Sequence, residues 1–288
     1  MNGFTMQETS FPVVTIIVDD ASTDGEQEII QRYLDEHFEE PYRKDETEYA
    51  NIICSKHRTN PNCIFVVFFL KYNHYSIKKS KIRYLSEWLD NAKYSALCEG
   101  DDYWTHPKKL QMQVDFMEDH PDHSLCFHAN SFLYSDGQTK EYYPYKEDVE
   151  VCPMNDIIGG GGSFMATNSM LYVYELGKGF RKTWAKSCQV GDLPLMLTLA
   201  VKGKVGYLNE IMSCYRYVSE GSWTQRVSRN KKELRKFHKG SSQLWREFDN
   251  WTNYKYHKII RLRIIRITIR YWIKQILFRF SFVKNIFS

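Results

Sequence analysis

The seven cysteines of this 288-residue chain lack the paired spacing that marks a zinc site or a redox centre. Their number is odd, they are far apart, and no CxxC occurs, so we predict reduced thiols in a cytosolic protein. The first residues, MNGFTMQETSFPVV, have neither the basic stretch nor the apolar stretch of a secretory signal. No uninterrupted apolar run is long enough to cross a bilayer, and no internal repeat is present.

The composition is that of a folded protein, with 43% hydrophobic, 15% aromatic and 26% charged residues. The length suits one large domain, or one domain with an appendage. A net charge of +4 conceals an asymmetry, because Tyr254–Ser288 holds nine Lys/Arg and no Asp/Glu. The rest of the chain is therefore acidic, and a nucleic-acid partner is not expected.

Apolar runs of strand length alternate with segments of helical periodicity, which predicts an α/β fold. The expected strands are 13–18, 51–55, 64–70, 94–98, 124–128 and an apolar stretch at 164–174. The expected helices are 27–38, 78–91, 108–118 and 192–200. The glycines at 159–162 lack the Lys-Ser/Thr of a phosphate loop, so we interpret them as a flexible hinge or loop.

Two acidic pairs follow separate strands of this predicted sheet. Asp19-Asp20 come after 13–18, and Asp101-Asp102 come after 94–98. The carboxyl ends of parallel strands in one sheet meet at one crevice, so both pairs are expected there. Carboxylates are the ligands of hard divalent cations. The alternative interpretation of each pair is a solvated acidic turn.

Three segments, VDDASTDG (18–25), CEGDDYW (98–104) and GDLPL (191–195), resemble the family 2 glycosyltransferases of bacterial polysaccharide synthesis. The resemblance runs from about Asn2 to Thr224 and includes KGKVGYL (202–208). It implies a GT-A fold, a Rossmann-like mixed sheet flanked by helices. It also implies that Asp19 and Asp20 lie at the nucleotide, that Asp101 lies near the ribose and diphosphate, and that Asp102 binds Mn²⁺ or Mg²⁺.

The same resemblance places Asp192 at the catalytic base, which takes the proton from the acceptor hydroxyl in an inverting displacement. An Asp two residues before Pro194 is also a good helix N-cap, and both roles can hold. Arg216 is a candidate diphosphate contact, because a guanidinium matches phosphate oxygens, although a surface arginine is the alternative. The expected partners are a UDP- or GDP-linked sugar and a saccharide or lipid-linked acceptor.

The C-terminal part is predicted to be a separate extension. We expect a glycosyltransferase domain over 1–225 and a helical, basic and aromatic extension over 226–288. Arg263, Arg266, Arg270 and Lys274 fall within a narrow helical sector, which favours an anionic membrane surface as partner. The alternative is a terminal helix packed on the core with solvated arginines. We therefore expect a peripheral protein on the cytoplasmic face of the plasma membrane.

One departure from the family pattern leaves a second hypothesis open. The family opens with a strand ending in Tyr-Asn, whereas this chain starts in what would be the following helix, at 3–7. The family's processive Gln-x-x-Arg-Trp motif is also missing, which favours a single transfer. The two hypotheses are a metal-assisted glycosyltransferase of cell-surface polysaccharide or lipopolysaccharide synthesis, and a truncated or non-catalytic membrane-surface protein with a GT-A-like fold.

Overall fold

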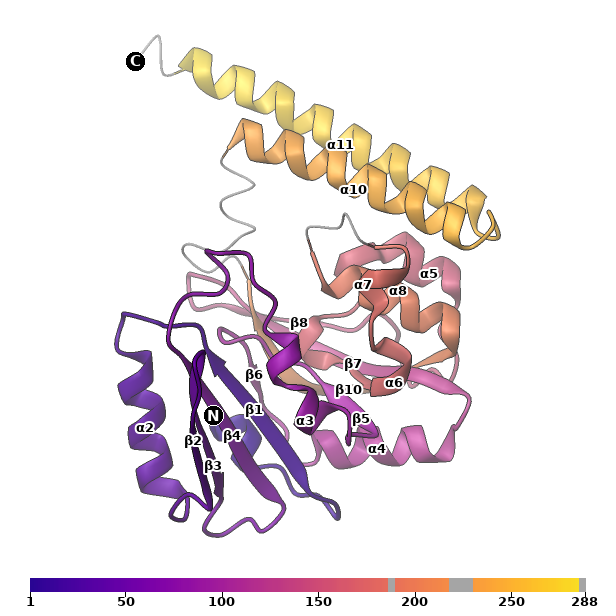
Figure 1. The fold of residues 1–288 in the computed structure, drawn as a ribbon. Coiled ribbons are helices and arrows are strands. Elements are labelled where there is room, and N and C mark those ends of the chain that lie inside the picture. The colour runs from indigo at the N-terminus through magenta and orange to yellow at the C-terminus, as the bar shows by residue number, and fades with distance from the viewer. Residues whose placement is uncertain (186–189, 218–229, 285–288) are drawn as a thin grey trace. The chain divides into compact units, whose positions relative to one another are not determined.

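The computed structural model describes residues 1–185, 190–217 and 230–284, with side chains described up to residue 277. It is a mixed α/β protein whose sheets are flanked by helices, which confirms the α/β class (Figure 1). The chain divides into two compact units. Unit 1 comprises Met1–Ser95 and Trp104–Phe116, and unit 2 comprises Ala96–Tyr103 and the chain from Met117 onward. The predicted boundary between 225 and 226 lies outside the described residues and stays a prediction.

Unit 1 is built on a four-stranded sheet in the order β1-β4-β3-β2. The edge strand β1 pairs in parallel with β4, and Val13 lies opposite Cys63 while Asp19 lies opposite Phe69. The other two pairs are antiparallel. The elements of unit 1 are α1 (Asn2–Thr5), β1 (Val13–Asp19), α2 (Glu26–His37), β2 (Arg43–Glu46), β3 (Ala50–Lys56), β4 (Cys63–Leu70), a 3₁₀ turn (Ile82–Tyr84), α3 (Ser86–Leu89) and α4 (Lys109–Asp119) as far as Phe116.

Both faces of this sheet are covered, as expected for strands made of nearly continuous β-branched and aromatic residues. On one face, Ile30 and Leu34 of α2 pack with Phe65 and Val67 of β4. The opposite face buries the alternating residues, among them Ile52 of β3 with Val66, Phe68 and Leu70 of β4. The expected strands at 13–18, 51–55 and 64–70 and the expected helix at 27–38 are therefore confirmed.

Unit 2 contains most of a second sheet, in the order β5-β9-β7-β10-β6, with β8 also paired to β7. The long strands β7 and β10 are parallel, whereas β8 and β9 run antiparallel to β7. The division between the units falls inside β5 and inside β6. The strands are β5 (Tyr94–Ala96), β6 (Tyr103–Trp104), β7 (His123–Leu133), β8 (Thr139–Tyr142), β9 (Leu171–Val173) and β10 (Lys204–Arg216).

Helices cover the core of unit 2, which is formed by strand residues such as Phe127 and Tyr207 and by Leu197 of α8. Helices α10 and α11 form an antiparallel hairpin that adds Trp245 and Phe248 to this core (Figure 1). Asn230 caps α10 by accepting the N–H groups of Lys232 and Glu233. The helices and turns of unit 2 are α5 (Met154–Gly160), 3₁₀ turns at Gly161–Ser163 and Thr167–Ser169, α6 (Tyr174–Gly177), α7 (Phe180–Thr183), α8 (Asp192–Lys202), α10 (Lys231–Trp251) and α11 (His257–Lys284).

Two expected elements are wrong in extent. The helix expected over 78–91 is reduced to a 3₁₀ turn and one turn of α3, and Lys78, its expected first residue, takes a positive φ of 55° that a helix does not allow. The strand expected over 164–174 is reduced to Leu171–Val173. A 3₁₀ turn at Thr167–Ser169 interrupts it and turns the Asn168 side chain toward the carbonyl of Cys214, 3.0 Å away.

The glycines at 159–162 form a closely packed helix end and not the expected flexible loop. They end α5 and begin a 3₁₀ turn, and the Arg263 guanidinium of α11 donates a 2.7 Å hydrogen bond to the carbonyl of Gly159. Gly161 has a φ of 56°, and a Cβ added there would collide with the same guanidinium. The sequence therefore needs glycine at 161 for its backbone conformation and for the close approach of α11.

We predict that Gly161→Ala destabilises the protein, by about 1–3 kcal/mol, because an L side chain is strained at this φ. Urea unfolding monitored by circular dichroism measures this loss. The matched control is Gly162→Ala, since a Cβ at Gly162 meets no atom within 4 Å and its φ is not positive. If the two variants are equally stable, the need for glycine at position 161 is contradicted.

Candidate functional site

Three carboxylates gather in the loop between β5 and β6. Glu99, Asp101 and Asp102 each offer one oxygen, and these oxygens lie within 4.8 Å of one another. All three belong to unit 2, and Asp102 is buried while the other two are exposed. Opposite ligands of a Mg²⁺ or Mn²⁺ ion are about 4.2 Å apart, since each bond is about 2.1 Å long. Small side-chain rotations would therefore bring the three oxygens onto one ion.

Asp102 is the most constrained of these carboxylates, with 8% of its surface exposed. Its Oδ1 accepts the backbone N–H of Arg216 at 2.9 Å, whereas its buried Oδ2 has no hydrogen-bond partner among the described residues. Burial raises the pKa of Asp102 to about 7, and the charges of Asp101 and Glu99 add to this increase against the opposing Arg216 N–H. An orphaned carboxylate oxygen is costly, and a cation beside it would offset that cost.

Asp192 belongs to the same electrostatic neighbourhood. It is the exposed first residue of α8, and its charge contributes to the raised pKa of Glu99, after the larger effect of reduced hydration of the Glu99 carboxylate. Burial and then the charges of Glu99, Asp102, Asp101 and Asp192 raise the pKa of Tyr215 to about 12. The predicted N-cap role of Asp192 is wrong, because Gly191 is the cap residue and no side chain caps this helix.

Arg216 reaches this site through its position at the end of β10. Its backbone N–H holds Asp102, and its exposed guanidinium lies 5.9 Å from the ring centroid of Tyr103. The positive charge of Arg216 also lowers the pKa of Asp102, although less than burial raises it. The structure therefore brings together four of the predicted site residues, Asp101, Asp102, Asp192 and Arg216.

Asp19 and Asp20 lie in unit 1, at the end of β1. Asp19 is only 2% exposed, and it holds the following turn through Ser22 N–H at 3.3 Å and the side chain of Gln27. The expectation that both acidic pairs follow strands of one sheet is wrong, because β1 and β5 belong to different sheets.

Asp20 anchors the loop after β4. It accepts the N–H groups of His74 at 2.8 Å and Tyr75 at 3.0 Å, and the ammonium of Lys81 at 3.0 Å. Burial alone would raise the pKa of Asp20, but these hydrogen bonds outweigh burial and lower it. Its carboxylate is thus an ionised anchor, and both acids shape the edge of unit 1 where β1 ends.

Sequence reasoning missed two members of the site, Glu99 and Tyr215. The sequence could have indicated Glu99, since it stands two residues before Asp101 in the same acidic loop. The prediction included only the adjacent pair, Asp101 and Asp102. Tyr215 gave no such signal. It becomes relevant because the last residues of β10 lie beside this loop.

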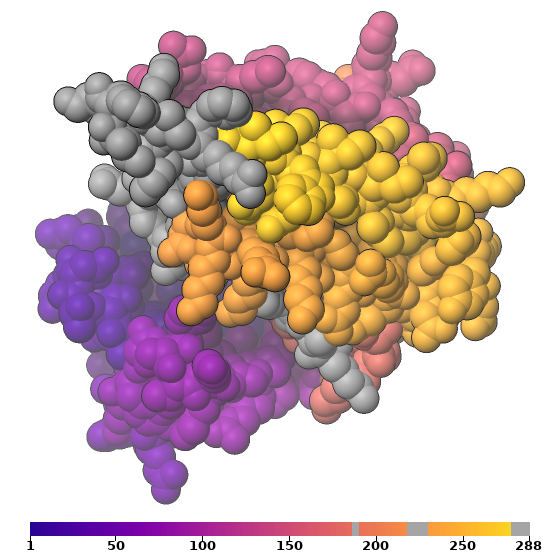
Figure 2. All heavy atoms as spheres, turned by 90° about the horizontal axis from the view of Figure 1, so that it is seen from above, coloured from indigo at the N-terminus to yellow at the C-terminus, as the bar shows by residue number. Residues whose placement is uncertain are grey.

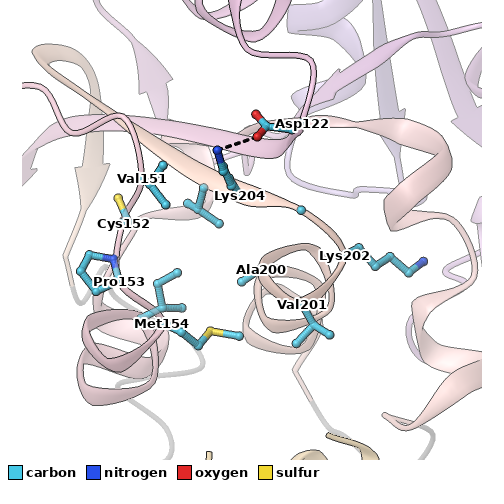
Figure 3. Close-up of a pocket in the computed structure, with 12 residues that line it drawn as sticks. Asp122, Val151, Cys152, Pro153, Met154, Ala200, Val201, Lys202 and Lys204 are labelled. Atoms are coloured by element: carbon cyan, nitrogen blue, oxygen red, sulfur yellow. Dashed lines mark ion pairs between the residues drawn. The ribbon is translucent and has the colours of Figure 1, made fainter. Parts of the chain in front are cut away.

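A separate cavity of about 440 Å³ lies in unit 2 among α5, the end of α8 and the start of β10 (Figure 3). Its charged groups are already engaged: Lys204 pairs with Asp122 at 2.6 Å, and Lys202 extends away to the carbonyl of Leu176. Burial raises the pKa of the Cys152 thiol to about 12, so this thiol is not a nucleophile at neutral pH. None of the lining residues belongs to the acidic loop.

We predict that the contribution of Asp102 to the stability of the metal-free protein is lost as the pH rises from about 4 to about 7. The folded state binds the Asp102 proton more tightly than the unfolded state, because the pKa rises from 3.8 to about 7 on folding. Above pH 7, Asp102→Asn should therefore exceed the wild type in stability by up to about 4 kcal/mol, and near pH 4 the two should agree. Denaturant unfolding in a chelator at both pH values measures this, with exposed Asp119→Asn as control. If Asp102→Asn is no more stable than the wild type at high pH, the raised pKa of the buried Asp102 carboxyl group is contradicted.

Comparison with known proteins gives relatives of undefined activity. No protein-family model matches the chain. An uncharacterized protein of Mycobacterium bovis and one of Mycobacterium tuberculosis are each 30% identical to it over 226 residues. The match covers 77% of this chain and 55% of each relative, so the chain spans about half the length of the curated relatives that it matches. The chain is similar to these mycobacterial proteins, and the similarity assigns no function to it.

Proposed function

We propose that this chain is a nucleotide-sugar-dependent glycosyltransferase with a GT-A-type fold, which transfers one sugar to an acceptor hydroxyl with inversion. The observation that carries the proposal is the loop cluster of Glu99, Asp101 and Asp102, together with the buried Oδ2 of Asp102, which has no hydrogen-bond partner among the described residues. The resemblance of VDDASTDG, CEGDDYW and GDLPL to family 2 glycosyltransferases supports it.

In this proposal the acidic loop holds a divalent cation. Glu99, Asp101 and Asp102 would bind Mn²⁺ or Mg²⁺, and the ion when bound would neutralise charge on the diphosphate of the donor. Asp102 contributes most to the position of the site, because the Arg216 N–H fixes one of its oxygens, while the other has no hydrogen-bond partner among the described residues. The exposed Asp101 and Arg216 lie where they could also contact the donor.

Asp192 is the proposed catalytic base. It is exposed at the start of α8, makes no capping bond, and stands close enough to the acidic loop to influence the pKa of Glu99. An acceptor hydroxyl there would pass its proton to Asp192 while it attacks the anomeric carbon of the donor. The anomeric bond to the nucleoside diphosphate breaks as the new bond forms, so the product is inverted.

Asp19 and Asp20 have a supporting part on the nucleotide side. The resemblance assigns both to a UDP- or GDP-linked donor. Within unit 1, Asp19 holds the turn after β1, and Asp20 fixes the loop that contains His74 and Lys81. A saccharide or lipid-linked acceptor fits a role in cell-surface polysaccharide or lipopolysaccharide synthesis. The competing hypothesis is a GT-A-like protein without catalysis.

We predict that UDP or GDP binds to the protein only when Mn²⁺ or Mg²⁺ is present. Asp102→Asn should weaken this binding at least about tenfold, since even outer-shell partners of metal sites contribute that much. Isothermal titration calorimetry with and without Mn²⁺ measures the affinity, and Asp119→Asn is the matched control. Absence of binding for both nucleotides in a folded sample would favour the non-catalytic hypothesis.

For Asp192→Asn, the expected result is a loss of turnover with unchanged nucleotide binding. Loss of a general base lowers the rate by about 10²–10⁴-fold, while the metal and the donor keep their ligands. The rate is measured as the release of nucleoside diphosphate, either in donor hydrolysis or in transfer to an added saccharide acceptor. If Asp192→Asn retains the wild-type rate in such an assay, the base lies elsewhere.

A further inference from the structure

Helix α11 is apolar on two opposite sides, and the protein covers only one of them. On the inner side, Ile260 is fully buried, and Ile264 and Ile267 pack against the core of unit 2. Tyr271 stacks on His238 of α10 with ring centroids 4.3 Å apart, and the hydroxyl of Thr268 lies 3.3 Å from the same histidine. These contacts fix which side of α11 faces the protein.

The outer side carries a stripe of exposed apolar side chains. At 3.6 residues per turn they lie on the side opposite Ile260, Ile264 and Ile267, and they extend over about 21 Å. Each is between 49% and 59% exposed. The members of this outer stripe are Leu262, Ile265, Ile269, Trp272, Ile273 and Ile276.

Cations border the outer stripe, and acids do not. Arg266 and Arg270 are exposed along one border, and Arg261 is exposed along the other. Arg263 is different, because its guanidinium turns inward to Gly159 and lies 5.9 Å from the ring centroid of Trp245. The sequence from Tyr254 to Ser288 contains no Asp or Glu, so the whole outer side of α11 is apolar or positive.

From this arrangement we infer that the outer stripe of α11 docks in the plane of an anionic lipid bilayer. A helix in the interface buries its apolar side among acyl chains while its flanking Lys and Arg meet lipid phosphates. In Figure 2, α10 and α11 lie side by side on the surface that faces the viewer, so the hairpin is accessible. Among the described residues, no helix is both long and apolar enough to cross a membrane.

A second copy of the chain is a poorer occupant for this stripe. A twofold interface would place the same surface against itself, and its cationic borders would then face identical cations. Like charges at such an interface oppose association, and the outer side offers no carboxylate to pair with them. A bilayer with anionic headgroups would bury the apolar stripe among its acyl chains and pair the cationic borders with its phosphates. The inference does not depend on glycosyl transfer.

The test is cosedimentation of the full chain with phosphatidylcholine vesicles that contain about 30% phosphatidylglycerol. We expect binding to these vesicles, much weaker binding to pure phosphatidylcholine, and release when salt rises from about 0.1 M to about 1 M. Arg266→Gln together with Arg270→Gln should weaken binding about 25-fold, at about fivefold for each cation removed.

The apolar stripe is tested by the triple variant Ile265→Gln, Ile269→Gln and Ile273→Gln, which should abolish vesicle binding. Its matched control changes three equally exposed isoleucines outside α11, Ile29→Gln, Ile77→Gln and Ile82→Gln, and should bind like wild type. Circular dichroism shows whether both variants fold. Equal binding by the two triple variants would overturn the inference. The inference would also be overturned if the wild type forms a dimer that does not bind vesicles while the α11 triple variant is a monomer.

Discussion

The parallel pairing of β7 with β10 is the constraint on which the candidate site depends. At its carboxyl end, Asn130 lies opposite Ser213, and both bond to the buried Asn168 at 3.0 Å. A satisfied buried polar network of this kind allows one register, because a slip would leave its amides unpaired. Three residues beyond Ser213, the same register presents the N–H of Arg216 to Asp102. The position of the acidic loop is therefore determined by a strand that starts more than a hundred residues later.

The acidic loop concentrates negative charge where water is restricted. Reduced hydration is the largest influence on the pKa of Glu99, Asp102 and Tyr215, and neighbouring carboxylates act in the same direction on all three. Without a cation, the protein holds Asp102 at a pKa of about 7, so this carboxyl changes its charge near neutrality. A divalent ion would reverse these pKa changes, since it favours the ionised carboxylates. Metal binding and proton release at this loop are thus two aspects of one equilibrium.

The elements that the sequence predicted well are those with a strong local pattern. The apolar runs at β1, β3 and β4 and the periodicity of α2 and α8 needed no distant information. The segment 78–91 has helical spacing, yet Asp20 bonds to His74 and Lys81 and holds the loop before it in another conformation. Asp101 and Asp102 were predicted from their position after an apolar strand, and the same pattern included Asp19. Its burial could not be read from the sequence, because it depends on Gln27 and the start of α2.

Helix α11 shows why a charge pattern alone does not identify a surface. Arg263 falls in the same helical sector as Arg266, Arg270 and Lys274, and the sequence gives no reason to separate them. The structure separates them through Gly161, where the missing side chain admits the Arg263 guanidinium to the end of α5. Burial, and then the charges of Arg270 and Arg266, lower the pKa of Arg263, which is the cost of turning it inward. That inward turn fixes the rotation of α11 on unit 2, and the rotation leaves the second apolar side of the helix facing outward between its remaining cations.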